Sequence, residues 1–236
     1  MSWIKQKLRK IFYKEPKGNG EPIFTTINKK KFDFESWSGL FADLSHWEEH
    51  FDVEAYDCPI LINKCSDGIS YIDSTHVPRK KACAVKGITY SGYHFYECDD
   101  DPIKQANFYI ITHGAFEVNP ILDYETNGSQ NDKDLKNSKE DCLKFLKHVQ
   151  LITGKTPIIY TGLALAKFLQ MDSRFAEFPL WLAVYRSKNN PPMPPSPWNT
   201  FFAWQYSDKE KIAGCGNADA SIYNKQMDLF NLGKAK

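Results

Sequence analysis

The chain has 236 residues, a net charge of +1 and 42% hydrophobic residues, which is enough for one large α/β domain. It contains no apolar run of the roughly 18 residues that a membrane-spanning helix needs, so we expect no stable membrane insertion. The first residues are basic but lack the continuous apolar segment and small-residue cleavage site of a signal peptide, so we expect none.

Charge is unevenly distributed along the chain. Residues 1–31 hold nine Lys or Arg and two Glu, a net charge of +7, which leaves −6 for the remainder. We interpret residues 1–38 as a basic leader, partly disordered and solvated. A basic arm of this kind could also bind an anionic polymer, an anionic membrane surface or a partner protein. We do not expect a nucleic-acid partner.

The six cysteines are scattered and form no Cys-x-x-Cys pair. This spacing gives little support to a zinc site and favours isolated thiols in a reducing compartment, although one disulfide stays open. No grouping of His, Asp or Glu has the spacing of metal ligands, so we expect neither a metal nor a cofactor.

After the leader, short apolar runs alternate with helical segments. Helices are predicted at 75–86, 101–114, 138–153 and 163–171; the second starts with Asp101 as N-cap and Pro102 in the first turn, and closes at Gly114. Eight strands are predicted, at 40–45, 59–64, 88–95, 120–125, 157–162, 179–185, 201–207 and 220–224.

This alternation predicts a β/α barrel, and the barrel should lack helices on one side. The segment "SKNNPPMPPSPW" after the sixth strand contains five prolines and cannot be helical. Polar residues at the strand ends should converge on one rim, where function sits in such folds. The predicted rim residues are Asp43, Asn63, His94, Asp123, Glu125, Tyr160, Tyr185 and Gln205.

The strand "PILDYE" carries two acids on one face, because side chains alternate along a strand and Asp123 lies two residues before Glu125. Two carboxylates then share one patch, and burying such a pair in an apolar core is costly, so we expect function at this strand end. The alternative interpretation is an exposed strand end where both acids are solvated.

The order of motifs resembles the glycoside hydrolase family 25 lysozymes. Asp43 to Trp47 ("DLSHW") match the family's opening element, and "YIDSTHVPRKKACAVKGITYSGYHFYE", "QANFYI", "ILDYE", "TGKTPIIYTG", "FPLWLAVY" and "FAWQYSD" follow in order. The resemblance covers roughly residues 39–225 and leaves 226–236 as a C-terminal tail. It implies a flattened, irregular single-domain β/α barrel of about eight strands and about five helices.

The resemblance also implies residue roles. Glu125 matches the general acid, Asp123 its partner, and Asp43 the acid of the first strand. Asp219 matches a late acid, but Ala218 precedes it and Ser221 replaces a second polar residue, which departs from the family pattern. The candidates for substrate binding are Tyr93, His94, Tyr160, Trp181, Tyr185 and Gln205.

The resemblance implies a peptidoglycan hydrolase that cleaves the β-1,4 bond between N-acetylmuramic acid and N-acetylglucosamine. Two alternatives remain: a hydrolase of another N-acetylhexosamine polymer, and a catalytically silent wall-binding or virion structural protein. The missing signal peptide and the basic leader favour a phage lysin, made in the host cytoplasm and acting on the wall after release, or a virion-associated enzyme. We expect a monomer whose partner is the peptidoglycan glycan strand.

Overall fold

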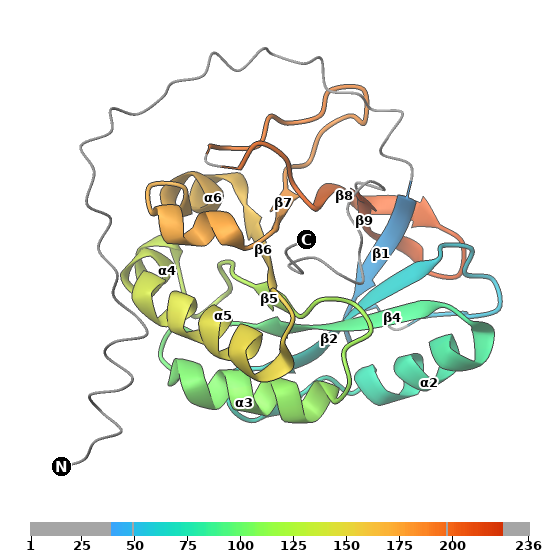
Figure 1. Ribbon diagram of the computed structural model, residues 1–236. Helices are drawn as coiled ribbons and strands as arrows, with labels where there is room; N and C mark the ends of the chain where they lie inside the picture. Colours follow the sequence, from blue (N-terminus) through green and yellow to red (C-terminus); the bar gives the residue numbers. More distant parts are fainter. Residues whose placement is uncertain (1–38, 49, 197, 224–236) are drawn as a thin grey trace, which may run out of the picture. The chain divides into compact units, whose positions relative to one another are not determined.

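The computed structural model describes residues 39–48, 50–196 and 198–223 (Figure 1). The predicted leader at 1–38 and the predicted tail at 226–236 lie outside the described residues.

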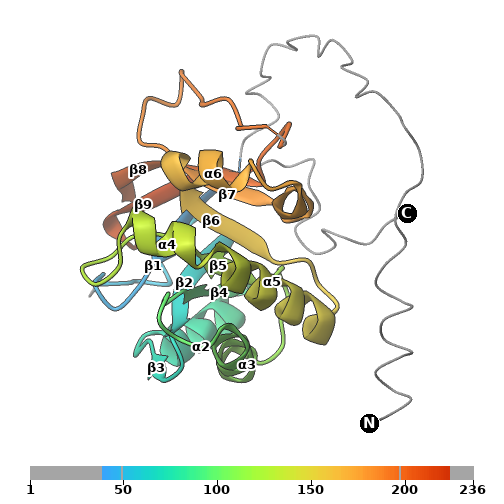
Figure 2. The same cartoon turned by 90° about the vertical axis from the view of Figure 1, so that its left-hand side faces the viewer.

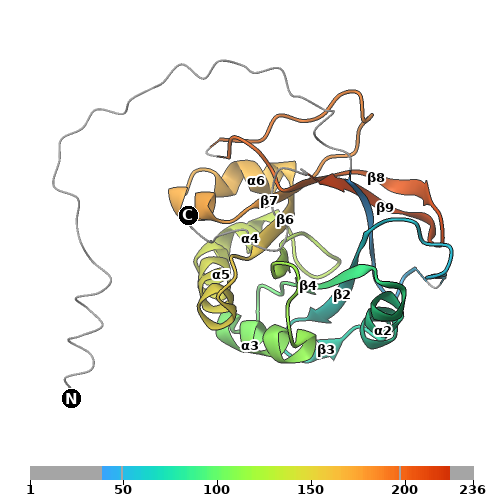
Figure 3. The same ribbon diagram turned by 45° about the vertical axis from the view of Figure 1, so that its right-hand side comes forward.

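Eight strands close into a barrel. Around the ring the order is β1-β9-β8-β7-β6-β5-β4-β2, and a parallel pairing of β1 with β2 closes it (Figure 3). All neighbours run parallel except β9, which is antiparallel to both β1 and β8. The ring strands are β1 Gly39–Leu44, β2 Ile60–Asp67, β4 Thr89–Phe95, β5 Ile121–Asp123, β6 Ile158–Gly162, β7 Leu180–Ala183, β8 Ala203–Ile212 and β9 Gly216–Tyr223. A two-residue strand, β3 Tyr71–Ile72, extends the sheet outside the ring by pairing with β2.

The helices cover only part of this barrel. In Figures 2 and 3 they flank the strands from β2 to β7, while β8 and β9 run without a helix beside them. Within the described ranges the helices are α2 His76–Lys86, α3 Pro102–His113, α4 Asp132–Asn137, α5 Lys139–Thr153 and α6 Leu163–Leu169, with a 3-10 helix η2 Ser173–Glu177. The predicted eight-stranded barrel with about five helices is therefore confirmed, including its helix-poor side.

Local sequence signals set the helix ends. The Asp101 carboxylate accepts hydrogen bonds from the backbone N–H groups of Ile103 and Lys104, and Pro102 occupies the first turn, as predicted. Helix α4 was not predicted, because only Leu135 of its six residues is buried and no apolar period marks it. Its start is fixed instead by a capping box, in which Asn131 and Asp134 bond each other's backbone N–H groups.

Alternation along the strands divides the apolar side chains into two cores. The inner core fills the barrel and includes Phe41, Ile62, Ile121, Ile158 and Trp181. The larger outer core packs the strands against the helices. Each fully buried side chain of this kind stabilises the fold by about 1.5–3 kcal/mol. Polar groups, rather than this inner core, occupy the mouth of the barrel at the carboxyl ends of the strands.

The last two strands are longer than predicted and form a hairpin. They extend to 203–212 and 216–223, where the sequence predicted 201–207 and 220–224. The connecting turn requires Gly214: its φ is +78°, and a Cβ there would lie 2.4 Å from the carbonyl oxygen of Asp52. Among the described residues no helix is long and apolar enough to cross a bilayer.

Candidate active site

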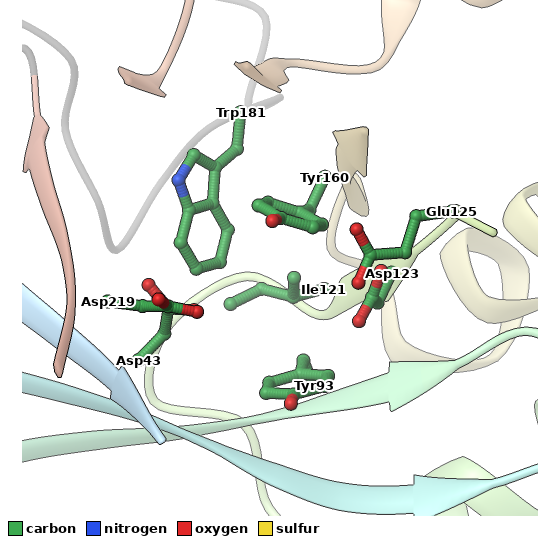
Figure 4. A pocket seen from close by; sticks show the side chains of 8 residues that line it. All are labelled: Asp43, Tyr93, Ile121, Asp123, Glu125, Tyr160, Trp181 and Asp219. Carbon is green, nitrogen blue, oxygen red and sulfur yellow. The ribbon is translucent and has the colours of Figure 1, made fainter. Parts of the chain in front are cut away.

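A pocket opens at the mouth of the barrel (Figure 4). Its walls combine four carboxylates with three aromatic side chains and one aliphatic side chain. The lining residues are Asp43, Tyr93, Ile121, Asp123, Glu125, Tyr160, Trp181 and Asp219. All four acids that the sequence singled out therefore lie in one pocket, although they come from positions 43 to 219 of the chain. In Figure 4 they form two pairs on opposite sides, with Asp43 near Asp219 and Asp123 near Glu125.

The first carboxylate pair is produced by strand pairing. Asp43 on β1 and Asp219 on β9 are direct partners in the antiparallel ladder. The Gln205 amide donates to both oxygens of Asp43, at 2.9 and 3.1 Å. The nitrogen of the Gln205 amide faces Asp43, so the amide oxygen of Gln205 points away from Asp43. That oxygen accepts a hydrogen bond from the Tyr160 hydroxyl at 2.9 Å. Asp43 is thus held by a fixed chain of hydrogen bonds.

The second pair comes from the end of β5. Asp123 is 5% exposed, and its register partners are Phe95 on β4 and Tyr160 on β6. Between the two acids, Tyr124 points outward: it is fully buried, and its hydroxyl donates to the backbone oxygen of Leu135. Because Tyr124 is held on the outer face, the next residue, Glu125, points back into the pocket, as the predicted alternation requires.

Asp123 differs from Asp43 in its hydrogen bonding. Its Oδ1 atom is buried and has no hydrogen-bond partner among the residues that the structure describes. A buried carboxylate oxygen without a donor is costly, and such groups are rare in folded proteins. The oxygen therefore marks a place where a substrate N–H or O–H group would be bound.

Burial and mutual repulsion raise the pKa of all four carboxyls. Burial, with the negative charge of Asp219, raises the pKa of Glu125 to about 7. Burial, with nearby acids, raises the pKa of Asp219 to about 6. The pKa values of Asp43 and Asp123 lie well above the usual range, because of burial first and then the charges of Asp219 and Glu125 respectively. The pocket therefore holds protonated acid at mildly acidic to neutral pH.

A cation close to these acids was not predicted. Lys64 lies at the same level as Tyr93 in the β2–β4 ladder, and its charge lowers the pKa of both Asp123 and Glu125. Its ammonium group is 2.6 Å from Asp67 Oδ2. The alternation of side chains along β2 could have predicted the position of Lys64. Lys64 must face the barrel interior if its neighbour Asn63 faces outward. Asn63 does so: it is fully buried and accepts from Arg79 in the outer layer.

The structure places the six candidates for substrate binding at different distances from the pocket. Tyr93, Tyr160 and Trp181 line the pocket, and Gln205 reaches it through Asp43. The placement of His94 in the site was wrong: it follows Tyr93 directly, so it points to the opposite face of β4. There it is fully buried, contacts Ser66 Oγ and Gln105 Oε1, and stacks on Phe145.

Tyr185 also lies outside the pocket. The sixth predicted strand ends at Ala183 rather than at 185, and the Tyr185 side chain is 54% exposed. It lines a neighbouring depression with residues 186–188 and 206–210. The structure therefore places Tyr185 near the carboxylates, whose charges add to the effect of burial in raising its pKa, but not among the residues that line the pocket.

The described residues offer no metal centre, since no three His, Cys, Asp or Glu side chains among them are grouped to hold an ion. The six cysteines carry free thiols, five of them buried.

A β/α barrel with four carboxylates of raised pKa at its mouth has the features of a glycoside hydrolase. Comparison with known proteins agrees. Residues 42–215 match the family described as Glycosyl hydrolases family 25, and the chain belongs to this family.

Individual relatives are more distant. The chain is 26% identical over 199 residues to the uncharacterized protein YegX of Escherichia coli K12, covering 79% of this chain and 70% of that protein. The lysozyme of Streptomyces coelicolor is structurally similar, with a TM-score of 0.66, 21% identity and coverage of 78% and 91% of the two chains. A family GH25 lysozyme from Aspergillus fumigatus gives a TM-score of 0.64, 24% identity and coverage of 80% and 94%.

Proposed function

We propose that the protein is a muramidase that cleaves the β-1,4 bond between N-acetylmuramic acid and N-acetylglucosamine in peptidoglycan. The observation that carries this proposal is the meeting of two carboxylate pairs in one pocket of a family 25 glycoside hydrolase. The similar solved structures from Streptomyces coelicolor and Aspergillus fumigatus are lysozymes, which supports peptidoglycan as the substrate.

In this scheme Glu125 is the general acid. With a pKa raised to about 7, it is largely protonated in mildly acidic solution and can donate its proton to the leaving glycosidic oxygen. The bond from that oxygen to the anomeric carbon breaks as positive charge develops on the sugar. Asp219, whose pKa is raised only to about 6, is largely ionised near pH 7, where much of Glu125 is still protonated, and it supplies negative charge on the opposite side of the pocket.

Asp123 is assigned to the substrate's 2-acetamido group. Its unpartnered Oδ1 accepts from the acetamido N–H, which turns the acetamido carbonyl oxygen toward the anomeric carbon. That oxygen forms the new bond as the glycosidic bond breaks, and a cyclic oxazolinium ion results. Glu125, now ionised, then takes a proton from water, whose oxygen opens the ring. Two displacements at the same carbon give net retention of configuration.

Digestion of purified peptidoglycan, followed by mass spectrometry of the released glycans, tests the activity. We expect fragments with N-acetylmuramic acid at the reducing end, released at least about 100-fold more slowly by Glu125→Gln. Fragments from chitin alone would favour another N-acetylhexosamine polymer, and no fragments at all would favour a silent wall-binding or virion protein.

The stereochemistry is tested separately. NMR of freshly released N-acetylmuramic acid ends, recorded before mutarotation, should show the β-anomer. An initial α-anomer would mean that water attacks directly, with Asp123 or Asp219 as its base.

A further inference from the structure

Beside the pocket, three aromatic side chains form a continuous array that we call the rim shelf: His46, Trp47 and Tyr71. The ring centroids of Trp47 and His46 are 4.6 Å apart, with an angle of 37° between the planes. The His46 and Tyr71 centroids are 5.9 Å apart at 60°. Trp47 is 79% exposed and Tyr71 is 41% exposed, so the array has an open apolar surface.

A buried carboxylate holds the rim shelf in place. Asp73 is 1% exposed, and its Oδ2 atom accepts from both the backbone N–H of His46, at 3.1 Å, and the ring Nδ1 of His46, at 2.9 Å. The other oxygen of Asp73 accepts from the backbone and hydroxyl of Thr75, at 2.9 and 2.5 Å. The Tyr71 hydroxyl lies 3.2 Å from the same His46 nitrogen. The bonds from Asp73 fix the His46 ring, which packs between Trp47 and Tyr71, before any ligand arrives. An ordered His46 lowers the entropic cost of binding at the shelf.

The rim shelf lies near the residues that border the pocket. The Lys64 ammonium lies 5.7 Å from the centre of the Tyr71 ring and 4.6 Å from the centre of the Phe95 ring. Phe95 is the register partner of Asp123. In the sequence, His46 of the shelf follows the pocket residue Asp43 by three positions. The shelf and the carboxylates therefore lie on the same side of the barrel, at the carboxyl ends of β1, β2 and β5.

We propose that the rim shelf is a sugar subsite that stacks one pyranose ring of the glycan strand, outside the pocket where bond cleavage occurs. The inference rests on the proposed muramidase function. One side of Trp47 is occupied by His46, and the rest of the ring is available to the C–H face of a neutral sugar. The pocket is lined by only eight residues and cannot hold a polymer, so adjoining units must lie on the surface next to it.

Kinetics on substrates of two lengths test this subsite. Trp47→Ala should raise KM for long glycan strands about tenfold, equivalent to about 1.4 kcal/mol, and change kcat less than twofold. On the shortest cleavable fragment, which fills only the pocket, Trp47→Ala and wild type should have the same KM. Trp47→Phe, which keeps an aromatic face, should recover most of the affinity for long strands. Met171→Ala is the matched control, because Met171 is 82% exposed and lies outside both the pocket and the shelf.

Binding without cleavage gives a second measurement. In a Glu125→Gln background, calorimetry with purified glycan fragments of increasing length should show a step in affinity, and Trp47→Ala should abolish that step. If Trp47→Ala binds and cleaves long strands like wild type, the shelf has no role in glycan binding, while the muramidase proposal stands. If wild type releases no fragments of any length, the proposed function itself fails.

Discussion

Replacing Glu125 with Gln removes the proton donor from the pocket while keeping the size of the side chain. General acid catalysis commonly contributes about 100-fold to 10,000-fold in rate, so kcat should fall by at least about 100-fold. In wild type only the protonated acid is active. Because burial and Asp219 raise the pKa of Glu125 to about 7, wild-type kcat should fall about tenfold for each pH unit above 7.

The same substitution should stabilise the fold. The pKa of Glu125 rises from 4.5 in the unfolded chain to about 7 in the folded protein, so the folded state binds the proton more tightly. The stability from this group is fully present below pH 4.5 and is lost as pH rises through 7. The difference corresponds to about 3 kcal/mol in the free energy of unfolding. Gln carries no charge to bury, so Glu125→Gln should have the higher Tm above pH 7.

Activity on purified peptidoglycan and thermal unfolding at pH 5 and pH 8 measure both effects together. Glu117→Gln is the matched control, because Glu117 is exposed and lies outside the pocket. Loss of activity together with a raised Tm at pH 8 is the expected result. A variant that keeps its activity would refute the role of Glu125 as acid. A lower Tm at pH 8 would refute the account of its buried charge.

The other predictions concern the groups around the acid. Asp123→Asn should lower kcat about 100-fold, and a substrate without the 2-acetamido group should react equally poorly with wild type and variant; a normal rate on that substrate would exclude acetamido assistance. Gln205→Leu removes both donors from Asp43, so the pKa of Asp43 should rise further, and titration by NMR should show it; an unchanged pKa would contradict the pairing. Trp181→Phe loses the 3.0 Å hydrogen bond to Ser221 Oγ and leaves a small cavity. Urea unfolding should show a loss of about 1–3 kcal/mol, and no loss would show that the pocket wall repacks freely.

The sequence predicted most of the barrel because its signals are local. Apolar runs ending in polar residues marked the strands, and Asp101 with Pro102 marked the start of α3. One error in the predicted site arose where two adjacent residues of a strand were assigned to the same face. Tyr93 and His94 were both assigned to the site, yet neighbours on a strand face opposite sides, and only Tyr93 enters the pocket.

Other features depend on contacts that are remote in sequence. The rim shelf requires Asp73 to bond His46, a contact across 27 residues that no spacing rule predicts. The pairing of Asp43 with Asp219 could be inferred only from the family resemblance, because it depends on a strand that runs against its neighbours.

That antiparallel strand also determines when the pocket comes into existence. The ribosome releases a chain from its N-terminus, so β1 to β8 emerge before β9. Until residues 216–223 insert between β1 and β8, the ring has a gap and Asp43 has no Asp219 beside it. A nascent chain, or one truncated before β9, carries three of the four carboxylates but not the enclosed site that raises their pKa values. We therefore expect a chain truncated before β9 to lack both Asp219 and the closed barrel mouth, and to lack hydrolytic activity.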